Sequence, residues 1–199
     1  MPIIFEKQID AAKKLAVWHI TEQLVELSAL CAYLPHPQLS IKRNTEIAVS
    51  RLLLQFLLQS DKSIAFSKDE NGKPFLANSN TAISFTHSKA MVACIINLDA
   101  RNVGIDIEII RDKIKLIAPK FVTQNDVTPF VETCHSHLIW GAKEVLYKIY
   151  ALKGLDFKDH LKVNITLNNG YGEINKNEYF SKHNIEYLIL HDYMLVWGW

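Results

Sequence analysis

The sequence is poor in the features that mark secreted and membrane-spanning proteins. It holds 3 cysteines in 199 residues, and Cys31, Cys94 and Cys134 are widely spaced. An odd number at such spacings argues against a disulfide framework and favours a reducing compartment. The chain lacks both an apolar run of about 18 residues and a charged start followed by an apolar signal segment. We therefore expect a cytoplasmic protein that is neither exported nor bound to a membrane.

An excess of charge of one sign is also missing. The 22 Lys and Arg residues nearly balance the 21 Asp and Glu residues, for a formal net charge of +1. No basic run or aromatic-interleaved Lys/Arg stripe is present, which argues against nucleic-acid binding. An acidic protein partner would have to meet a local basic patch. The Cys134-His135-Ser136-His137 stretch lacks a second ligand pair at a fitting spacing, so we expect no zinc there.

What is present is an ordinary globular composition, with a hydrophobic fraction of 49%. Hydrophobic periodicity predicts helices and strands mixed along the chain, and a short polar turn at 99–102 predicts a boundary between residues 1–100 and 101–199. The Asn168-Asn169-Gly170 stretch is typical of a hairpin turn. Helices are predicted near 20–32, 41–59, 113–120 and 130–152, and strands near 3–5, 64–67, 82–86, 91–97, 104–110, 161–167, 171–175 and 185–198.

Two stretches carry the charged residues of greatest chemical interest. In the stretch 103–109, isoleucines alternate with Asp106 and Glu108, so a strand would bury the apolar set and present both carboxylates on its other face. Some thirty residues later, Glu144 and Lys148 stand one helical turn apart. Three carboxylates suit a hard cation, and a lysine beside them suits a phosphate that the cation also contacts. The combination predicts metal-assisted phosphoryl chemistry.

Each feature also has a plain structural interpretation. A pair of acids two residues apart is common on the solvated face of a strand. Glu144 and Lys148 spaced four apart can be a surface ion pair, worth about 0.2–0.5 kcal/mol in an isolated helix. The functional interpretation therefore depends on a third stretch upstream.

That stretch contains Gly72-Lys73-Pro74 and then Ser84, His87 and Ser88 in a Ser-x-x-His-Ser pattern. With Gly-Ile-Asp-Ile-Glu at 104–108 and Trp-x-x-Lys-Glu-x-x-x-Lys at 140–148, the order and intervals resemble the 4'-phosphopantetheinyl transferases of the surfactin-synthetase-activating (Sfp-like) type. The matched blocks span residues 71–148. Relatives carry a Phe-Phe-x-x-x-Glu element where this chain has Phe121 to Asp126, so the resemblance leaves the role of Asp126 open.

The resemblance implies an activity and a fold. The 4'-phosphopantetheine arm of coenzyme A would pass to a serine of an acyl or peptidyl carrier protein, releasing adenosine 3',5'-bisphosphate. The implied fold is α+β, with two pseudo-twofold-related α+β lobes and the active site in the cleft between them. By analogy the protein would be a monomer, while the carrier and its pathway have no readable signature.

The resemblance also implies roles for the acidic motif and the helix that follows it. Asp106, Glu108 and Glu144 would hold Mg²⁺, with Mn²⁺ as the alternative. Lys148 would stabilise the pyrophosphate, and Glu144 would be a ligand of the cation, the base that deprotonates the serine, or both. Asp106, Glu144 and Lys148 form the implied catalytic set. Lys143 would contact the pantetheine side or a phosphate.

Coenzyme A itself would be held by residues from the first half of the chain. His87 and Ser88 would bind its phosphates, and Lys73 would line the pocket for the adenine and the 3'-phosphate. One arginine of the 41–59 helix would clamp the 3'-phosphate, because a guanidinium can grip phosphate oxygens with two donors. By the resemblance, Arg43 has the expected spacing to Gly-Lys-Pro, and Arg51 fits the expected local Ala-x-x-Arg-x-Leu-Leu pattern. The sequence therefore leaves both arginines as candidates.

Two other classes of function remain open from the sequence. A metal-dependent phosphohydrolase would use the same three carboxylates and Lys148, but it gives no role to Gly-Lys-Pro or His-Ser. A non-catalytic module that binds coenzyme A or a carrier protein would tolerate loss of a metal ligand or of Lys148, and this chain keeps all four.

Overall fold

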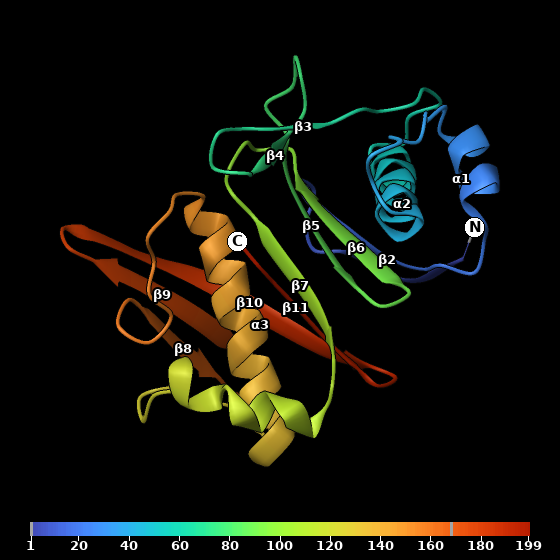
Figure 1. Ribbon diagram of the computed structural model, residues 1–199. Coiled ribbons are helices and arrows are strands. Elements are labelled where there is room, and N and C mark those ends of the chain that lie inside the picture. The colour runs from blue at the N-terminus through green and yellow to red at the C-terminus, as the bar shows by residue number, and fades with distance from the viewer. Residues whose placement is uncertain (1, 168) are drawn as a thin grey trace. The chain divides into compact units, whose positions relative to one another are not determined.

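The computed structural model describes residues 2–167 and 169–199 of a mixed α+β fold (Figure 1). Contacts between Cα atoms divide the chain into two units, Met1–Ala100 (unit 1) and Arg101–Trp199 (unit 2). The division falls in the short polar turn at 99–102, and each unit contains its own sheet and its own helical cover.

Unit 1 is an antiparallel sheet with helices packed on one face. Its strand order is β1-β2-β6-β5, and a small separate ribbon joins β3 to β4. The elements are β1 (Ile3–Gln8), β2 (Lys13–His19), α1 (Leu24–Leu30), α2 (Ile41–Leu57), β3 (Ser67–Lys68), β4 (Pro74–Phe75), β5 (Ala82–Ser88) and β6 (Met91–Asn97).

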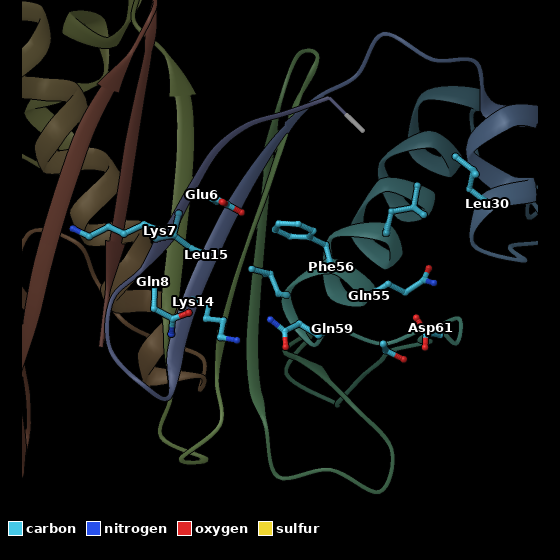
Figure 2. Close-up of a pocket in the computed structure, with 13 residues that line it drawn as sticks. Glu6, Lys7, Gln8, Lys14, Leu15, Leu30, Gln55, Phe56, Gln59 and Asp61 are labelled. Atoms are coloured by element: carbon cyan, nitrogen blue, oxygen red, sulfur yellow. The ribbon is translucent and has the colours of Figure 1, made fainter.

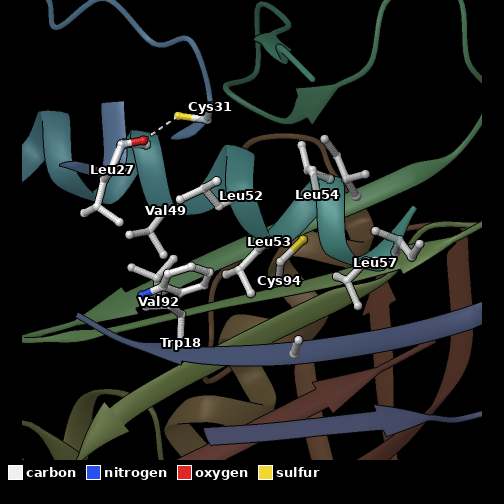
Figure 3. Close-up of a cluster of buried hydrophobic side chains, with 14 of the residues drawn as sticks. Trp18, Leu27, Cys31, Val49, Leu52, Leu53, Leu54, Leu57, Val92 and Cys94 are labelled. Atoms are coloured by element: carbon white, nitrogen blue, oxygen red, sulfur yellow. Dashed lines mark hydrogen bonds between the residues drawn. The ribbon is translucent and has the colours of Figure 1, made fainter. Parts of the chain in front are cut away.

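The core of unit 1 lies between α2 and the sheet (Figure 3). Val49 and Leu53 of α2 are fully buried, as are Trp18 of β2 and Cys94 of β6. Burying these side chains removes their apolar surface from water. This removal stabilises the unit by about 25 cal/mol per Å². The same packing fixes which face of α2 is turned away from the sheet.

The start of α2 is fixed by side-chain hydrogen bonds. Ser40 caps the helix by accepting the Arg43 backbone N–H at 3.2 Å, which satisfies one of the unpaired donors of the first turn. The buried Asn44 accepts from the Tyr33 hydroxyl at 2.6 Å and donates to backbone carbonyls of the preceding loop, including that of His36 at 3.1 Å. The position of Arg43 is therefore set by the backbone around it.

Unit 2 is a second antiparallel sheet, with strand order β7-β11-β10-β9-β8, packed against the long helix α3. The 3-10 turns η1 and η2 connect β7 to the loop that precedes α3. The elements are β7 (Gly104–Ile109), η1 (Asp112–Leu116), η2 (Ala118–Lys120), α3 (Glu132–Tyr150), β8 (Leu161–Ile165), β9 (Gly170–Lys176), β10 (Tyr179–Leu190) and β11 (Tyr193–Gly198).

Several predicted elements differ from those observed. The segment 113–120 forms two 3-10 turns instead of an α-helix, and Pro119 stands in the second one, since proline lacks the N–H that a longer helix needs. The predicted strand 185–198 is two strands, β10 and β11, and the strand expected at 64–67 is the short β3. Strands β2 and β4 were not predicted. The expected hairpin turn includes Asn168, which lies outside the described residues, although Ile165 of β8 pairs with Gly170 of β9.

Among residues 2–167 and 169–199, no helix has both the length and the apolar character needed to cross a bilayer.

Candidate functional site

The acidic motif lies where α3 packs directly on β7 within unit 2. A Cβ added to Gly104 would stand 2.4 Å from the backbone oxygen of Val145, and one added to Gly141 would stand 2.7 Å from a methyl of Val196 and 3.8 Å from Oδ2 of Asp106. Real Cβ atoms essentially never come that close to another atom. The two glycines therefore permit a helix-to-strand approach that places the carboxylate of Asp106 against α3.

The predicted strand pattern is present in β7. Ile105 and Ile107 are fully buried, while Asp106 and Glu108 stand at the alternate positions, opposite Val196 and Met194 of β11. Asp106 is itself buried, with 5% of its surface exposed. Because an ionised carboxylate in such a place needs a counter-charge, its partner is informative.

That partner is Lys148, from the last turn of α3. Its Nζ lies 2.9 Å from Oδ1 of Asp106 and donates a second hydrogen bond to the backbone oxygen of Ile105 at 2.7 Å. An ammonium has three donors, and the Lys148 side chain is 25% exposed. Lys148 is thus anchored to the acidic strand while part of it reaches solvent.

Glu144 lies one turn before Lys148 and shares this charged environment. Burial raises its pKa from 4.5 to about 7, and the nearby charges of Asp106 and Glu108 add to the increase, while Lys148 opposes it. A like charge disfavours ionisation in this way only when it is near. The three carboxylates predicted from the sequence therefore belong to one electrostatic cluster.

Whether this cluster suits a metal depends on both chemistry and position. Carboxylate oxygens are the ligands that Mg²⁺ prefers, and a divalent cation would offset the repulsion that raises the pKa of Glu144. Among the described residues, however, no three His, Cys, Asp or Glu side chains are placed to hold a metal ion together. The donor set therefore fits Mg²⁺ in kind, although the described arrangement does not gather three such side chains around one point.

The surroundings of Lys143 differ from those implied by the resemblance. Its side chain is fully buried, and Nζ donates to Asp126 at 2.9 Å, to the Phe121 backbone oxygen at 2.7 Å and to the Phe157 backbone oxygen at 2.9 Å. All three ammonium donors are thereby used. Lys143 is not presented to a phosphate or to pantetheine as the resemblance implied.

Asp126 completes this internal network. Its Oδ2 also accepts from the backbone of Thr123 at 2.8 Å, and its Oδ1 accepts from the backbone of Val163 at 3.0 Å. The pair formed by Lys143 and Asp126 ties the loop after η2 to α3 and β8. The role that the sequence left open for Asp126 is, in this structure, that of an internal anchor.

His137 is a member of the site region that sequence reasoning missed. It lies on α3 one turn before Gly141, is 5% exposed, and its Nε2 accepts the Arg111 backbone N–H at 2.9 Å. Nδ1 then carries the proton, and it is buried with no hydrogen-bond partner among the described residues. Burial lowers the pKa of His137, against opposing effects of the Arg111 backbone and of Asp106. The signal available in the sequence was that His137 precedes Glu144 by seven residues, which places both on one face of a helix.

In unit 1, Arg43 and His87 meet over a buried acid. NH1 of Arg43 lies 3.0 Å from Oε2 of Glu46 and 3.1 Å from Nε2 of His87, and Nδ1 of His87 lies 3.3 Å from Oε1 of Glu46. The Glu46 side chain is only 5% exposed, whereas those of Arg43 and His87 are 38% and 44% exposed. The two cationic or polar groups predicted to bind phosphate are therefore brought together, and both reach solvent.

The other predicted residues of unit 1 have different surroundings. Arg51 stacks over the Tyr33 ring, with 4.8 Å from its guanidinium carbon to the ring centre, and its Nε is buried without a hydrogen-bond partner in the described residues. Ser88 is buried at the end of β5. Lys73 is half-buried, and this burial lowers its pKa although Asp69 opposes the change. Of the two arginines, Arg43 is the one whose guanidinium lies beside His87, with 38% of its side chain exposed.

A groove of about 820 Å³ also occurs in unit 1, between β1, β2 and the end of α2 (Figure 2). Its lining mixes apolar side chains such as Phe56 with charges of both signs, among them Lys14 and Asp61. None of the residues predicted to bind coenzyme A lines it. The groove therefore adds nothing to the candidate site.

Comparison with known proteins gives no independent assignment. Models of protein families show no match to the sequence, and no curated protein matches it.

Proposed function

We propose that this protein transfers the 4'-phosphopantetheine group of coenzyme A to a serine of an acyl or peptidyl carrier protein and releases adenosine 3',5'-bisphosphate. The proposal rests above all on one observation: Glu144, with its pKa raised to about 7, shares a cluster with Asp106, Glu108 and Lys148. The four sequence motifs in their order support it, and the pseudo-twofold transferase fold belongs to the same proposal.

Glu144 suits the task of the general base. Its raised pKa lies close to neutral pH, where a base is both available and able to accept a proton. The serine hydroxyl would give its proton to Glu144 as its oxygen attacks the phosphorus nearer the pantetheine. The bond from that phosphorus to the bridging oxygen would break, and adenosine 3',5'-bisphosphate would leave.

Lys148 suits the task of stabilising the charge that develops during transfer. Its ammonium is held by Asp106 and by the Ile105 backbone, so its position costs no reorganisation when the substrate binds. Fixed donors of this kind are the main means by which proteins accelerate phosphoryl transfer. Bound Mg²⁺, held by Asp106, Glu108 and Glu144, would neutralise charge on the leaving bisphosphate.

The substrate assignment rests on unit 1. Arg43 and His87 form a solvent-reaching pair of the kind that recognises phosphate, and the guanidinium can donate two parallel hydrogen bonds. Lys73 and Ser88 complete the set proposed to bind coenzyme A. A simple phosphohydrolase would have no use for these residues.

The experiment is to measure the intact mass of an apo acyl carrier protein after incubation with this protein, coenzyme A and Mg²⁺. We expect a gain equal to one phosphopantetheine group, abolished by a chelator and by Glu144→Gln. The exposed turn residue Glu178 offers a matched control, and Glu178→Gln should transfer at the wild-type rate.

Two results would overturn the proposal. Binding of coenzyme A without a mass gain on fatty-acid, polyketide and peptidyl carriers alike would indicate a binding module. Release of bisphosphate from coenzyme A without a modified carrier would indicate a hydrolase.

A further inference from the structure

Among the described residues, the side-chain hydrogen bonds of Arg43 use one nitrogen of its guanidinium, NH1. NH1 donates to Glu46 at 3.0 Å and faces Nε2 of His87 at 3.1 Å. A terminal guanidinium nitrogen has two N–H groups, so NH1 is saturated by these two contacts. The edge formed by Nε and NH2 is then the part of Arg43 left to meet a ligand, and 38% of the side chain is exposed.

The same contacts determine which ring nitrogen carries the proton when His87 is neutral. A guanidinium can only donate, so Nε2 of neutral His87 must accept from Arg43, and its proton must lie on Nδ1. Nδ1 lies 3.3 Å from Oε1 of Glu46 and can donate to it. One buried carboxylate thus receives Arg43 on one oxygen and His87 on the other.

We infer that Glu46 and His87 are positioning residues that hold Arg43 through NH1, so that its Nε and NH2 edge grips the 3'-phosphate of coenzyme A. This inference rests on the proposed function for the identity of the ligand. In it, the buried Glu46 enters the site although no sequence motif pointed to it.

Glu46 can do this because a carboxylate accepts at both oxygens. A glutamine in its place has one accepting oxygen and one N–H₂ donor, so either Arg43 or His87 would face a donor in place of an acceptor. Lys42 also approaches Glu46, but at 3.8 Å and with 67% of its side chain exposed. An exposed pair at that distance contributes little, which makes Lys42 a suitable control position.

The test compares ligands with and without the 3'-phosphate. For Glu46→Gln, we expect KM for coenzyme A to rise by roughly tenfold or more, the size of one charge-assisted hydrogen bond. KM for 3'-dephospho-coenzyme A should rise by a much smaller factor than KM for coenzyme A, and KM should change more than kcat. Arg43→Ala should give the same pattern, and Glu46→Gln added to Arg43→Ala should have no further effect. Lys42→Gln should change KM by less than about threefold.

A binding measurement keeps this result separate from the transferase reaction. Calorimetry should show that Glu46→Gln and His87→Leu weaken the binding of adenosine 3',5'-bisphosphate. The binding of adenosine 5'-monophosphate, which lacks the 3'-phosphate, should change much less. If the wild type fails to modify any carrier but this pattern appears, the positioning inference stands and the transferase proposal fails. If carriers are modified but Glu46→Gln weakens the binding of both nucleotides equally, or of neither, the inference is overturned and the transferase proposal stands.

Discussion

Glu144 is the residue whose protonation links the proposed chemistry to stability. Its pKa is about 7 in the folded protein and near 4.5 when exposed, so the folded state binds this proton more tightly. The stabilising contribution is fully present below about pH 4.5 and is lost as the pH rises through about 7. At 1.36 kcal/mol per pKa unit, the loss is about 3 kcal/mol at most.

We therefore expect Glu144→Gln to remove this pH dependence. Its free energy of unfolding should exceed that of the wild type above pH 7 and should not fall between about pH 4.5 and 7 on account of this group. Urea unfolding followed by circular dichroism across this range would measure it, with Glu178→Gln as the control. Parallel pH profiles for wild type and Glu144→Gln would contradict the assignment.

The two lysines of the motif are expected to behave in opposite ways. Lys143→Met leaves the buried Asp126 carboxylate without its counter-charge, which costs about 3–5 kcal/mol of stability. Replacing Asp126 by leucine as well should recover a large part of this loss. Lys148→Met also removes the counter-charge of a buried acid, Asp106, but this pair is partly exposed whereas the Lys143–Asp126 pair is fully buried. It should therefore abolish carrier modification with a smaller loss of stability. Equal thermal shifts in the two single variants would argue against this division of roles.

The sequence could not have separated these lysines. Both occur in one motif, and the partners that bury Lys143 lie at Phe121, Asp126 and Phe157, far from it along the chain. Only the fold of the loop after η2 decides that its ammonium points inward. The carboxylates of β7, in contrast, were predictable because alternation along a strand is a local property.

At the scale of elements, the approach of α3 to β7 depends on the absence of two side chains. Gly104→Ala would place a methyl against the backbone of Val145, and Gly141→Ala would place one against the Val196 side chain. Backbone cannot yield as a side chain can, so we expect Gly104→Ala to be the more damaging, with a loss of about 1–3 kcal/mol typical of overpacking. It should also lower the pKa of Glu144 by separating it from Asp106.

Thermal unfolding and a titration of Glu144 by NMR would measure both effects. Gly72→Ala is the control, because nothing lies within 4 Å of its added Cβ and only its φ of +86° opposes the change, at a cost of about 1 kcal/mol. An unchanged Glu144 titration in Gly104→Ala would show that the close approach does not create the carboxylate cluster.

The long periodic elements were predicted best. Helices α2 and α3 and strands β5, β6 and β7 lie within a few residues of the expected ranges. Strand β2 was missed because its residues 15–18 form a continuous buried run with no alternation, a pattern that periodicity does not resolve. The tight turn between β10 and β11 was missed because it contains only two residues, His191 and Asp192, of which Asp192 alone is a typical turn former.

At the scale of the whole molecule, the residues proposed to bind Mg²⁺ and those proposed to bind coenzyme A belong to different units. The carboxylates and Lys148 belong to unit 2, whereas Arg43, Lys73, His87 and Ser88 belong to unit 1. We expect Mg²⁺ alone to slow hydrogen exchange in β7 and α3, and adenosine 3',5'-bisphosphate alone to slow it at the start of α2 and the end of β5.

Hydrogen exchange read by mass spectrometry would test this division, with Glu144→Gln and Arg43→Ala as variants that each lose one response and keep the other. Protection of the same segments by both ligands would contradict it. The sequence motifs named Arg43 and His87 separately, but their contact joins residues 44 apart in the chain, which a local pattern does not contain.

The close packing of α3 on β7 has a use outside this protein. An edge strand with the sequence Gly-x-Asp-x-Glu, run antiparallel to a helix with Gly-x-x-Glu-x-x-x-Lys, brings together three acids and one lysine. Gly104 lets the strand meet the Val145 backbone, and Lys148 pairs with Asp106. Protein designers could therefore transplant it as a unit into any scaffold in which a helix covers the edge of an antiparallel sheet.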